Sequence, residues 1–438
     1  MVTERRSLEG RRSFVCYAGD MASIRITGGR PLRGEVRVGG AKNSALKLMA
    51  AAILAPGVSV IRNVPDITDV ATMCDVLAGL GVRVERCDGS LRVDATELTS
   101  HEAPYEMVAR MRASIVVLGP LLGRLGVAHV ALPGGCNIGT RKIDMHISGL
   151  KHLGVEIGGG HGFIDAKADR LVGGHVVLDF PSVGATENLL MASVLAEGTT
   201  TIENAAREPE IQDLAAFLNE MGAGIEGAGT QTLTVEGVRT LHPAQHSVIG
   251  DRIEAGTYLV AGAIGGGPLT VRGVDPGHME MVLAKLEQAG CRVEALADGV
   301  LIERTGPLLP VDVATLPYPG FPTDMQPQFM TLMSMAGGNS VITENVFENR
   351  FMFADELTRM GADVRIEGHH ALVRGVDQLS GAPVRSPDLR AGAALVLAGL
   401  AADGETVVGD IHHILRGYEG FVQKLCDVGA QVRVDETD

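Results

Sequence analysis

The segment 132–146 reads LPGGCNIGTRKIDMH and combines residue types that a reactive site on a loop needs. Its glycines let the backbone approach a ligand closely, the adjacent cations Arg141 and Lys142 can hold an anion, and the thiol of Cys136 can react. Because two glycines precede Cys136, we expect its sulfur to be exposed on a turn. The alternative is a cysteine that only fills a gap in the packing.

Cations also stand where the sequence predicts the starts of helices. Lys42, Arg112 and Arg390 lie among polar residues that precede short apolar segments. Capping explains Ser, Thr and Asp at such positions, but positive charge is unfavourable there. A shared phosphate or carboxylate ligand, which free helix N–H groups also attract, would explain the cations. Arg141 and Arg416 would extend this anion-binding cluster, unless they lie on a solvated surface.

The cysteines and histidines do not follow a metal-binding pattern. The six cysteines show no CxxC or similar spacing, which argues against a zinc site and a disulfide scaffold. This usage fits a reducing, cytoplasmic setting. The pairs His369-His370 and His412-His413 lack further ligands in the sequence, and we expect them at the surface.

The elements that must position these residues repeat six times. In each repeat a helix-patterned segment ends in glycine, which fits a left-handed helix C-terminus, and an alternating segment follows, which fits a half-buried strand. In two units a turn signal, Asp88-Gly89 or Asp298-Gly299, then predicts a hairpin. The glycines are spaced by 68 to 73 residues, at Gly81, Gly154, Gly222, Gly290, Gly361 and Gly429.

Each unit also has a second, almost wholly apolar segment, which predicts a helix that is buried on all sides. These segments are residues 45–54, 115–122, 189–195, 258–264, 329–335 and 391–400. We therefore predict an α/β protein of six βαβ-type units, arranged as two domains of three with helices inside and sheets outside. A solenoid is the alternative, but its units are usually about 20–50 residues long.

Length and composition exclude several classes of protein. The chain has 438 residues, more than one core usually supports, which also favours two domains. A net charge of −15 and an aromatic content of 3%, with no tryptophan, argue against a nucleic-acid partner. No apolar run reaches about 18 residues, so we expect no membrane span. Residues 1–22 carry arginines but no apolar signal core, and we expect a disordered N-terminal tail.

Ten blocks of the sequence, in the same order, resemble the enolpyruvyl transferases. They extend from about Ser23 to Val434 and read GAKN, MRAS, LPGGCNIGTR, SVGATEN, ENAAREPEI, DRIEAGT, FPTDMQ, ENVFENRF, DLRAG and RGYE. The resemblance implies a two-domain inside-out α/β barrel fold with three repeated units per domain. It places the first domain at residues 42–249 and the second at residues 23–41 together with 250–438.

The resemblance also implies a reaction and its substrates. The enolpyruvyl group of phosphoenolpyruvate would pass to the 3′-hydroxyl of UDP-N-acetylglucosamine by addition and elimination, with release of phosphate. Such a reaction needs cations for a phosphate and a carboxylate, a base for the hydroxyl and an acid for the methylene carbon, but no metal or cofactor. The sequence leaves the oligomeric state open.

The matching blocks imply roles for individual residues. Cys136 would be the proton donor, Asp324 the base at the sugar hydroxyl and Asp388 an aid to proton transfer, with Lys42 and Arg416 also catalytic. Phosphoenolpyruvate would be bound by Lys42, Asn43, Arg112, Arg141, Arg390 and Arg416. The UDP-sugar would be bound by Asn43, Arg112, Arg141, Asp144, Ser182, Val183, Gly184, Asp324 and Val346. His146 lies near the nucleotide-binding positions, but a lone histidine at helical spacing is more often structural.

Two alternatives to this function stay open. One is transfer to a uridine nucleotide such as UMP in nucleoside-antibiotic synthesis, because relatives commonly have proline where Lys142 stands. The other is a non-catalytic paralogue that binds sugar nucleotides. The branch that acts on shikimate 3-phosphate lacks the cysteine loop and fits less well.

Overall fold

The computed structural model describes residues 22–103, 105–132, 138–139, 143–160 and 162–435. Within these ranges the chain forms six sheets of four strands each. Every sheet has the same plan, in which one outer strand runs parallel to its neighbour and the other pairs are antiparallel. The common plan is the structural counterpart of the sequence repeat.

The strands of the six sheets come from neighbouring parts of the chain, with three exceptions. Strands β1 and β2 join sheets of the C-terminal half, and β14 joins the sheet that contains β3. The sheet orders are β14 (Gln245–Ser247), β3 (Val58–Arg62), β5 (Ser90–Asp94), β4 (Arg83–Cys87); β6 (Glu102–Ala103), β7 (Val127–Ala131), β9 (Phe163–Lys167), β8 (Glu156–Gly158); β10 (His175–Val177), β11 (Thr199–Glu203), β13 (Thr232–Glu236), β12 (Gly224–Glu226); β2 (Gly34–Arg37), β15 (Leu269–Arg272), β17 (Gly299–Arg304), β16 (Cys291–Leu296); β18 (Val313–Ala314), β19 (Asn339–Thr343), β21 (His370–Arg374), β20 (Asp363–Glu367); and β22 (Pro383–Arg385), β23 (Glu405–Gly409), β1 (Ser23–Thr27), β24 (Gln431–Asp435).

Two sets of helices accompany these sheets. The predicted apolar segments form the inner set, α1 (Lys42–Ala51), the 3-10 helix η2 (Arg112–Val117) with α4 (Leu118–Leu125), α6 (Val183–Ser193), α8 (Arg252–Gly265), α10 (Gln326–Met333) and α12 (Leu389–Ala401). The amphipathic set comprises α2 (Thr68–Gly79), α5 (Asp144–His152), α7 (Pro209–Glu220), α9 (Glu280–Gln288), α11 (Ala354–Arg359) and α14 (Phe421–Asp427). None of the helices in the described residues is long and apolar enough to cross a membrane.

The six repeat glycines end the amphipathic helices as predicted. Their φ angles lie between 87° and 105°, a region that glycine adopts without strain. The Asp88-Gly89 hairpin between β4 and β5 is also confirmed, with positive φ at both residues. The second hairpin differs slightly, because Gly299 already pairs with Leu296 and the turn consists of Ala297 and Asp298.

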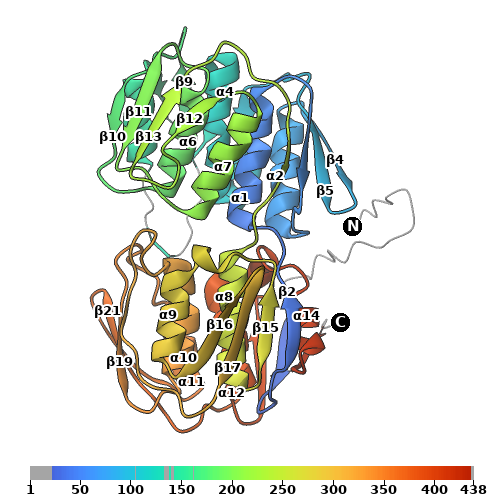
Figure 1. Cartoon of the computed structure of the whole chain (residues 1–438), viewed down its shortest axis with the longest axis vertical. Helices are drawn as coiled ribbons and strands as arrows, with labels where there is room; N and C mark the ends of the chain where they lie inside the picture. Colours follow the sequence, from blue (N-terminus) through green and yellow to red (C-terminus); the bar gives the residue numbers. More distant parts are fainter. Residues whose placement is uncertain (1–21, 104, 133–137, 140–142, 161, 436–438) are drawn as a thin grey trace.

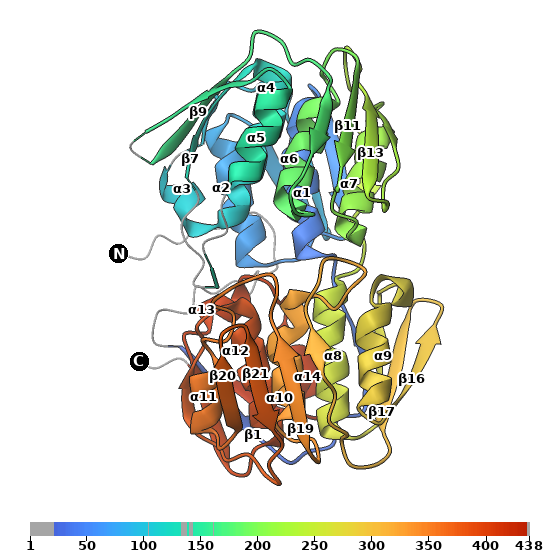
Figure 2. The ribbon, with the colours of Figure 1, turned by 90° about the vertical axis from the view of Figure 1, so that its left-hand side faces the viewer.

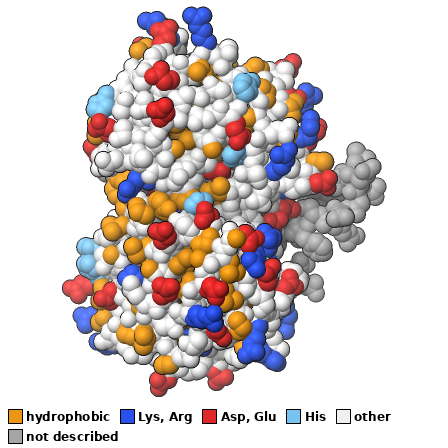
Figure 3. Space-filling view, in the orientation of Figure 1, with side chains coloured by type: hydrophobic (Ala, Val, Ile, Leu, Met, Phe, Trp, Pro, Cys, Tyr) orange, Lys and Arg blue, Asp and Glu red, His pale blue; other side chains and the backbone are white. Residues whose placement is uncertain are grey.

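Two hydrophobic cores divide the molecule into an upper and a lower lobe (Figures 1 and 2). The first core draws on residues from Ala41 to Val248, and the second on residues from Ala22 to Val38 and from Ile253 to Val432. Inner helices fill each core and the sheets surround them, which confirms the predicted α/β fold with helices inside and sheets outside. In Figure 3 hydrophobic side chains gather on one face where the lobes meet.

The two chain segments that connect the lobes lie side by side. Gly40 pairs with Gly250 in an antiparallel bridge, and the Ala41 amide donates to the Ile249 carbonyl at 2.7 Å. An added β-carbon at Gly40 would lie 1.8 Å from the Asn63 carbonyl oxygen, so only glycine fits at this crossing. We propose this crossing as the boundary between the predicted domains, 42–249 and 23–41 with 250–438.

Candidate active site

One acidic residue binds two predicted site cations at the junction of the lobes. Asp69, in the first turn of α2, accepts from Lys42 Nζ at 3.0 Å through Oδ2 and from Arg416 Nε at 2.8 Å through Oδ1. Burial alone would raise the pKa of Asp69, but the two cations outweigh it and lower that pKa. Because Lys42 belongs to the upper lobe and Arg416 to the lower, Asp69 joins the lobes through charge.

A second carboxylate, that of the predicted base Asp324, is 27% exposed and is held by two buried arginines. Asp324 Oδ2 accepts from Arg390 Nε at 3.2 Å, and Oδ1 pairs with Arg350 Nη2 at 3.0 Å. Both arginine side chains are at most 3% exposed. Burial would raise the pKa of Asp324, but Arg390, Arg350 and Lys42 together lower it. Burial lowers the pKa of Lys42 despite the opposite influence of Asp69, and the charges of Arg390 and Arg416 lower it further, so these cations lie near one another.

Glu344 organises the segment that carries Arg350. Its carboxylate accepts from Thr315 Oγ1 at 2.8 Å and from Thr323 Oγ1 at 2.9 Å. It also accepts from the Val346 amide at 2.8 Å. The predicted sugar-binding residue Val346 is therefore fixed beside Thr323 and close in sequence to Arg350.

Aspartates cap two helices whose N-termini reach the site. Asp251 Oδ1 accepts from the Ile253 and Glu254 amides at 2.9 and 3.0 Å, and its Oδ2 accepts from the Lys42 amide at 3.1 Å. The N-termini of α1 and α8 therefore meet at one carboxylate. Asp388 caps α12 in the same manner, accepting from the amides of Arg390 and Ala391 at 2.8 and 3.1 Å. These bonds give Asp388 a structural task beside its predicted role in proton transfer.

The predicted nucleotide-binding residues form a separate group at the start of α6. Ser182 caps this helix, accepting from the Ala185 amide at 3.3 Å, and Val183 and Gly184 form its first turn. An added β-carbon at Gly184 would lie 3.1 Å from His146 Cε1, so the histidine packs against this turn. Asp144, in the first turn of α5, is exposed.

His146 is buried and neutral beside the nucleotide-binding group. Burial and the nearby charge of Arg112 lower the pKa of His146 to about 4, despite the opposite influence of Asp144. Asn188 Nδ2 donates to the Ile115 carbonyl at 3.2 Å and lies 2.9 Å from His146 Nδ1. Nδ1 therefore accepts, and the imidazole proton resides on Nε2. Arg112 thus lies near His146 and Asp144.

The predicted cysteine loop connects β7 to α5, as the repeat spacing indicates, but its chemical residues Cys136, Arg141 and Lys142 lie outside the described residues. The described residue Ile138 accepts from the Asn349 amide at 3.1 Å. Asn349 precedes Arg350 in the lower lobe, so Ile138 contacts the residue next to the arginine that binds Asp324. Asn43 follows Lys42 in α1, and its carbonyl accepts from Lys47 Nζ at 3.0 Å.

Sequence reasoning missed two residues at the centre of the site, Asp69 and Arg350. Arg350 lies in the block ENVFENRF, which carried the family resemblance but no expected role for this arginine. Asp69 lies in the ordinary helix start ITDV, and only the fold brings it to Lys42 and Arg416. The expectation for the histidine pairs needs one correction, because His413 is only half exposed and its pKa is lowered by burial and by the charges of His412 and Arg416.

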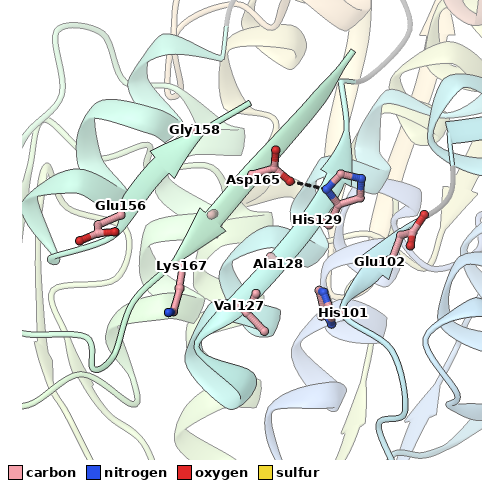
Figure 4. A pocket seen from close by; sticks show the side chains of 10 residues that line it. His101, Glu102, Val127, Ala128, His129, Glu156, Gly158, Asp165 and Lys167 are labelled. Atoms are coloured by element: carbon pink, nitrogen blue, oxygen red, sulfur yellow. Dashed lines mark hydrogen bonds and ion pairs between the residues drawn. The ribbon is translucent and has the colours of Figure 1, made fainter. Parts of the chain in front are cut away.

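A surface hollow of about 520 Å³ lies elsewhere, on the sheet of β6, β7, β8 and β9 (Figure 4). His101, Glu102, His129, Asp165 and Lys167 project around it, and His129 Nδ1 contacts Asp165. The described residues contain no group of three side chains that could hold a metal ion. The hollow shares no residue with the charged cluster between the lobes.

Comparison with known proteins agrees with the blocks and the fold. Residues 26–425 match the EPSP synthase (3-phosphoshikimate 1-carboxyvinyltransferase) family. The chain is 54% identical over 407 residues to the UDP-N-acetylglucosamine 1-carboxyvinyltransferase of Mycobacterium tuberculosis, covering 93% of this chain and 97% of that protein. It is 53% identical over 414 residues to UDP-N-acetylglucosamine 1-carboxyvinyltransferase 2 of Carboxydothermus hydrogenoformans, covering 94% and 99%.

Solved structures show the same fold. The enolpyruvyl transferase NikO from Streptomyces tendae superposes with a TM-score of 0.86 at 30% identity, covering 95% of this chain and 99% of that one. EPSP synthase from Acinetobacter baumannii superposes with a TM-score of 0.74 at 18% identity, covering 94% and 100%. The resemblance expected from the ten blocks is confirmed, and the chain belongs to the EPSP synthase family of enolpyruvyl transferases.

Proposed function

We propose that the protein transfers the enolpyruvyl group of phosphoenolpyruvate to the 3′-hydroxyl of UDP-N-acetylglucosamine and releases phosphate. The observation that carries this proposal is the cluster of Lys42, Arg350, Arg390 and Arg416 around the carboxylates of Asp69 and Asp324 between the lobes. Relatives at 54% identity bear the name of this activity. We propose further that the reaction serves peptidoglycan precursor synthesis in the cytoplasm.

The charged cluster suits an anionic substrate because its cations already bind carboxylates, which a substrate anion could replace. Asp69 holds Lys42 and Arg416, and a phosphate that displaced it would gain two charged hydrogen bonds. Asp324 shows in the same way that Arg350 and Arg390 can hold one carboxylate together. If one small molecule carries both a phosphate and a carboxylate, each of these two groups could therefore bind one pair of cations.

Asp324 can act as the base once the substrate relieves its arginines. A carboxylate with a strongly lowered pKa is a weak base, and the ion pairs with Arg350 and Arg390 lower the pKa of Asp324. When the substrate carboxylate forms ion pairs with those arginines, the pKa of Asp324 rises. A carboxylate oxygen of Asp324 can then take the proton of the sugar hydroxyl. The same anion thus binds and activates the site.

The steps of the proposed reaction balance with these groups. In the addition, the sugar oxygen gives its proton to Asp324 and bonds to C2 of phosphoenolpyruvate, while C3 receives a proton from the Cys136 thiol. In the elimination, the new methyl group returns a proton to the Cys136 thiolate, the bond from C2 to the phosphate oxygen breaks, and the proton held by Asp324 leaves with the phosphate. Lys42, Arg141 and Arg416 would stabilise the leaving phosphate.

Phosphate release distinguishes the proposed function from its alternatives. We expect the purified protein to release phosphate from phosphoenolpyruvate with UDP-N-acetylglucosamine, and little with UMP or shikimate 3-phosphate. Turnover with UMP alone would favour a nucleotide transferase instead. Binding of the sugar nucleotide without turnover would indicate the non-catalytic paralogue.

Alkylation by the epoxide fosfomycin tests the thiol separately. The glycine-rich setting of Cys136 in the block LPGGCNIGTR favours a reactive thiol. We expect one adduct by intact-mass analysis in the presence of the sugar nucleotide, and none in Cys136→Ser. Modification that persists in Cys136→Ser would place the reactive thiol elsewhere, and the exposed Cys87 is the first site to examine.

A further inference from the structure

Arg390 has a buried guanidinium that its ion pair uses only in part. Nε donates to Asp324 at 3.2 Å, whereas the buried Nη1 and Nη2 have no hydrogen bond of regular geometry to the described residues and interact electrostatically with the Tyr418 side chain. Buried polar groups in native proteins nearly always have a partner. The unused donor capacity of these two nitrogens therefore points to a ligand, which under the proposed function is an anionic group of phosphoenolpyruvate.

An aromatic ring supports this guanidinium. Arg390 Cζ lies 5.3 Å from the centre of the Tyr418 ring, and Tyr418 is 1% exposed. A guanidinium over an aromatic face is attracted by the negative charge of that face. Burial raises the pKa of the Tyr418 phenol, so the ring stays neutral at neutral pH.

The Tyr418 hydroxyl belongs to a network that fixes its direction. Thr257 donates its single hydroxyl proton to the Ile253 carbonyl at 2.8 Å, and Gln328 Nε2 donates to Thr257 Oγ1 at 3.0 Å. Thr257 Oγ1 also lies 2.9 Å from the Tyr418 hydroxyl oxygen. Because the Thr257 proton is already used, Tyr418 is the donor in this contact. Thr257 of α8 and Gln328 of α10 therefore both lie within hydrogen-bond distance of the Tyr418 hydroxyl, at 2.9 and 3.5 Å.

We propose that Tyr418, held by Thr257 and Gln328, is a positioning residue that keeps the Arg390 guanidinium directed at the anionic substrate. The inference rests on the proposed function and extends it to a residue that does not touch substrate. An arginine that is held in place before binding loses less conformational entropy when the substrate arrives. The network would therefore affect substrate affinity more than the chemical step.

The substitution Tyr418→Phe tests this role, with Tyr258→Phe as the matched control. Both tyrosines are buried in the second core and pack against Phe421, with ring centroids 4.9 Å and 5.9 Å away. The Tyr258 hydroxyl, however, has no hydrogen bond among the described residues. We expect Tyr418→Phe to raise KM for phosphoenolpyruvate about tenfold, because the loss of one hydrogen bond that holds Arg390 in place corresponds to about that change in affinity. KM for the UDP-sugar and Tm should match those of Tyr258→Phe.

A second variant, at the partner of the Tyr418 hydroxyl, makes the test decisive. Thr257→Val should change KM for phosphoenolpyruvate in the same direction as Tyr418→Phe. If both variants lower kcat and Tm but leave this KM unchanged, the tyrosine is only structural and the inference is wrong.

Calorimetric titration with phosphoenolpyruvate alone and with inorganic phosphate separates this inference from the proposed function. Weaker binding of phosphoenolpyruvate by Tyr418→Phe than by Tyr258→Phe supports the positioning role even if the wild-type protein shows no turnover, which would contradict only the proposed function. Equal binding by an active wild type and Tyr418→Phe overturns the positioning role alone. If the wild-type protein binds neither anion, Arg390 is not an anion ligand and the inference also fails.

Discussion

Asp324 occupies both of its oxygens with buried arginines, and this arrangement sets what its substitution will do. Replacement by Asn removes the base and leaves Arg350 and Arg390 without their shared counter-charge. We expect Asp324→Asn to lower kcat by about 10²–10⁴-fold, the usual contribution of a general base. Steady-state phosphate release measures this, with exposed Asp377→Asn as the control. A kcat within a few-fold of the wild-type value would exclude Asp324 as the base.

His246 makes stability depend on pH at a distance from the chemistry. Its Nε2 lies 2.8 Å from Asp213 Oδ1 and its Nδ1 lies 3.0 Å from Glu220 Oε1, and Asp213 also accepts from Ser44, next to Asn43 in α1. Burial alone would lower the pKa of His246, but the hydrogen bonds and charges of these two carboxylates raise it.

A raised folded-state pKa has a definite sign for stability. The contribution of His246 is complete below its unfolded pKa of about 6.5 and is lost as pH rises through the folded value. We expect the Tm difference between wild type and His246→Gln to be largest below about pH 6.5 and to shrink at alkaline pH. His175→Gln, at an exposed histidine, is the control. A difference that stays constant with pH would contradict the charged state of His246.

At the scale of single elements, Asp388 has two candidate roles, as the N-cap of helix α12 and as the predicted aid to proton transfer. Asn caps helices about as well as Asp, whereas Ala loses the cap at a cost of about 1 kcal/mol. If the residue acts only as the cap of α12, Asp388→Asn should keep both Tm and kcat, and Asp388→Ala should lower Tm. If the predicted aid to proton transfer is real, Asp388→Asn should lower kcat while Tm stays unchanged. Thermal unfolding and phosphate release on the two variants decide between the roles.

The elements themselves were predictable because their signals are local. The six glycines and the apolar segments appear in the sequence at nearly constant spacing, and each signal depends on a few neighbouring residues. Asp69 and Arg350 carried no such signal, because their importance comes from contacts across 26 to 347 residues of chain. The proximity of Arg112 to His146 likewise arises only from the fold, and its predicted place in the anion-binding cluster stays a prediction.

At the scale of the whole molecule, charged side chains join two cores that the sequence predicted only as separate units. Asp69 pairs with Arg416 from the other lobe, and Thr68 Oγ1 donates to the Leu415 carbonyl at 3.4 Å. A substrate that displaces Asp69 from Arg416 would break one of these links between the lobes. By binding cations of both lobes, the substrate would form a new link. Under the proposed function, the residues that bind the substrate phosphate therefore also link the two lobes.

A further buried ion pair between the lobes allows a test of how strongly their junction couples them. Arg252 of α8 binds Glu210 of α7 through Nε at 3.0 Å and Nη2 at 3.2 Å, and both side chains are at most 10% exposed. Arg252 Cζ also lies 5.5 Å from the centre of the Tyr318 ring. Removal of one partner leaves a buried charge, which typically costs about 3–5 kcal/mol.

We expect Glu210→Gln to lower stability by about 3 kcal/mol, toward the lower end of that range, because Glu208 still compensates part of the Arg252 charge. Scanning calorimetry should show a lower Tm than for Glu226→Gln, which changes an exposed glutamate of the same lobe. Since the pair links the two cores, the loss should also broaden the transition or divide it in two, as the lobes begin to unfold separately. Identical transitions in the two variants would mean that this pair does not couple the lobes, and that Asp69 and the connecting strands hold them together without it.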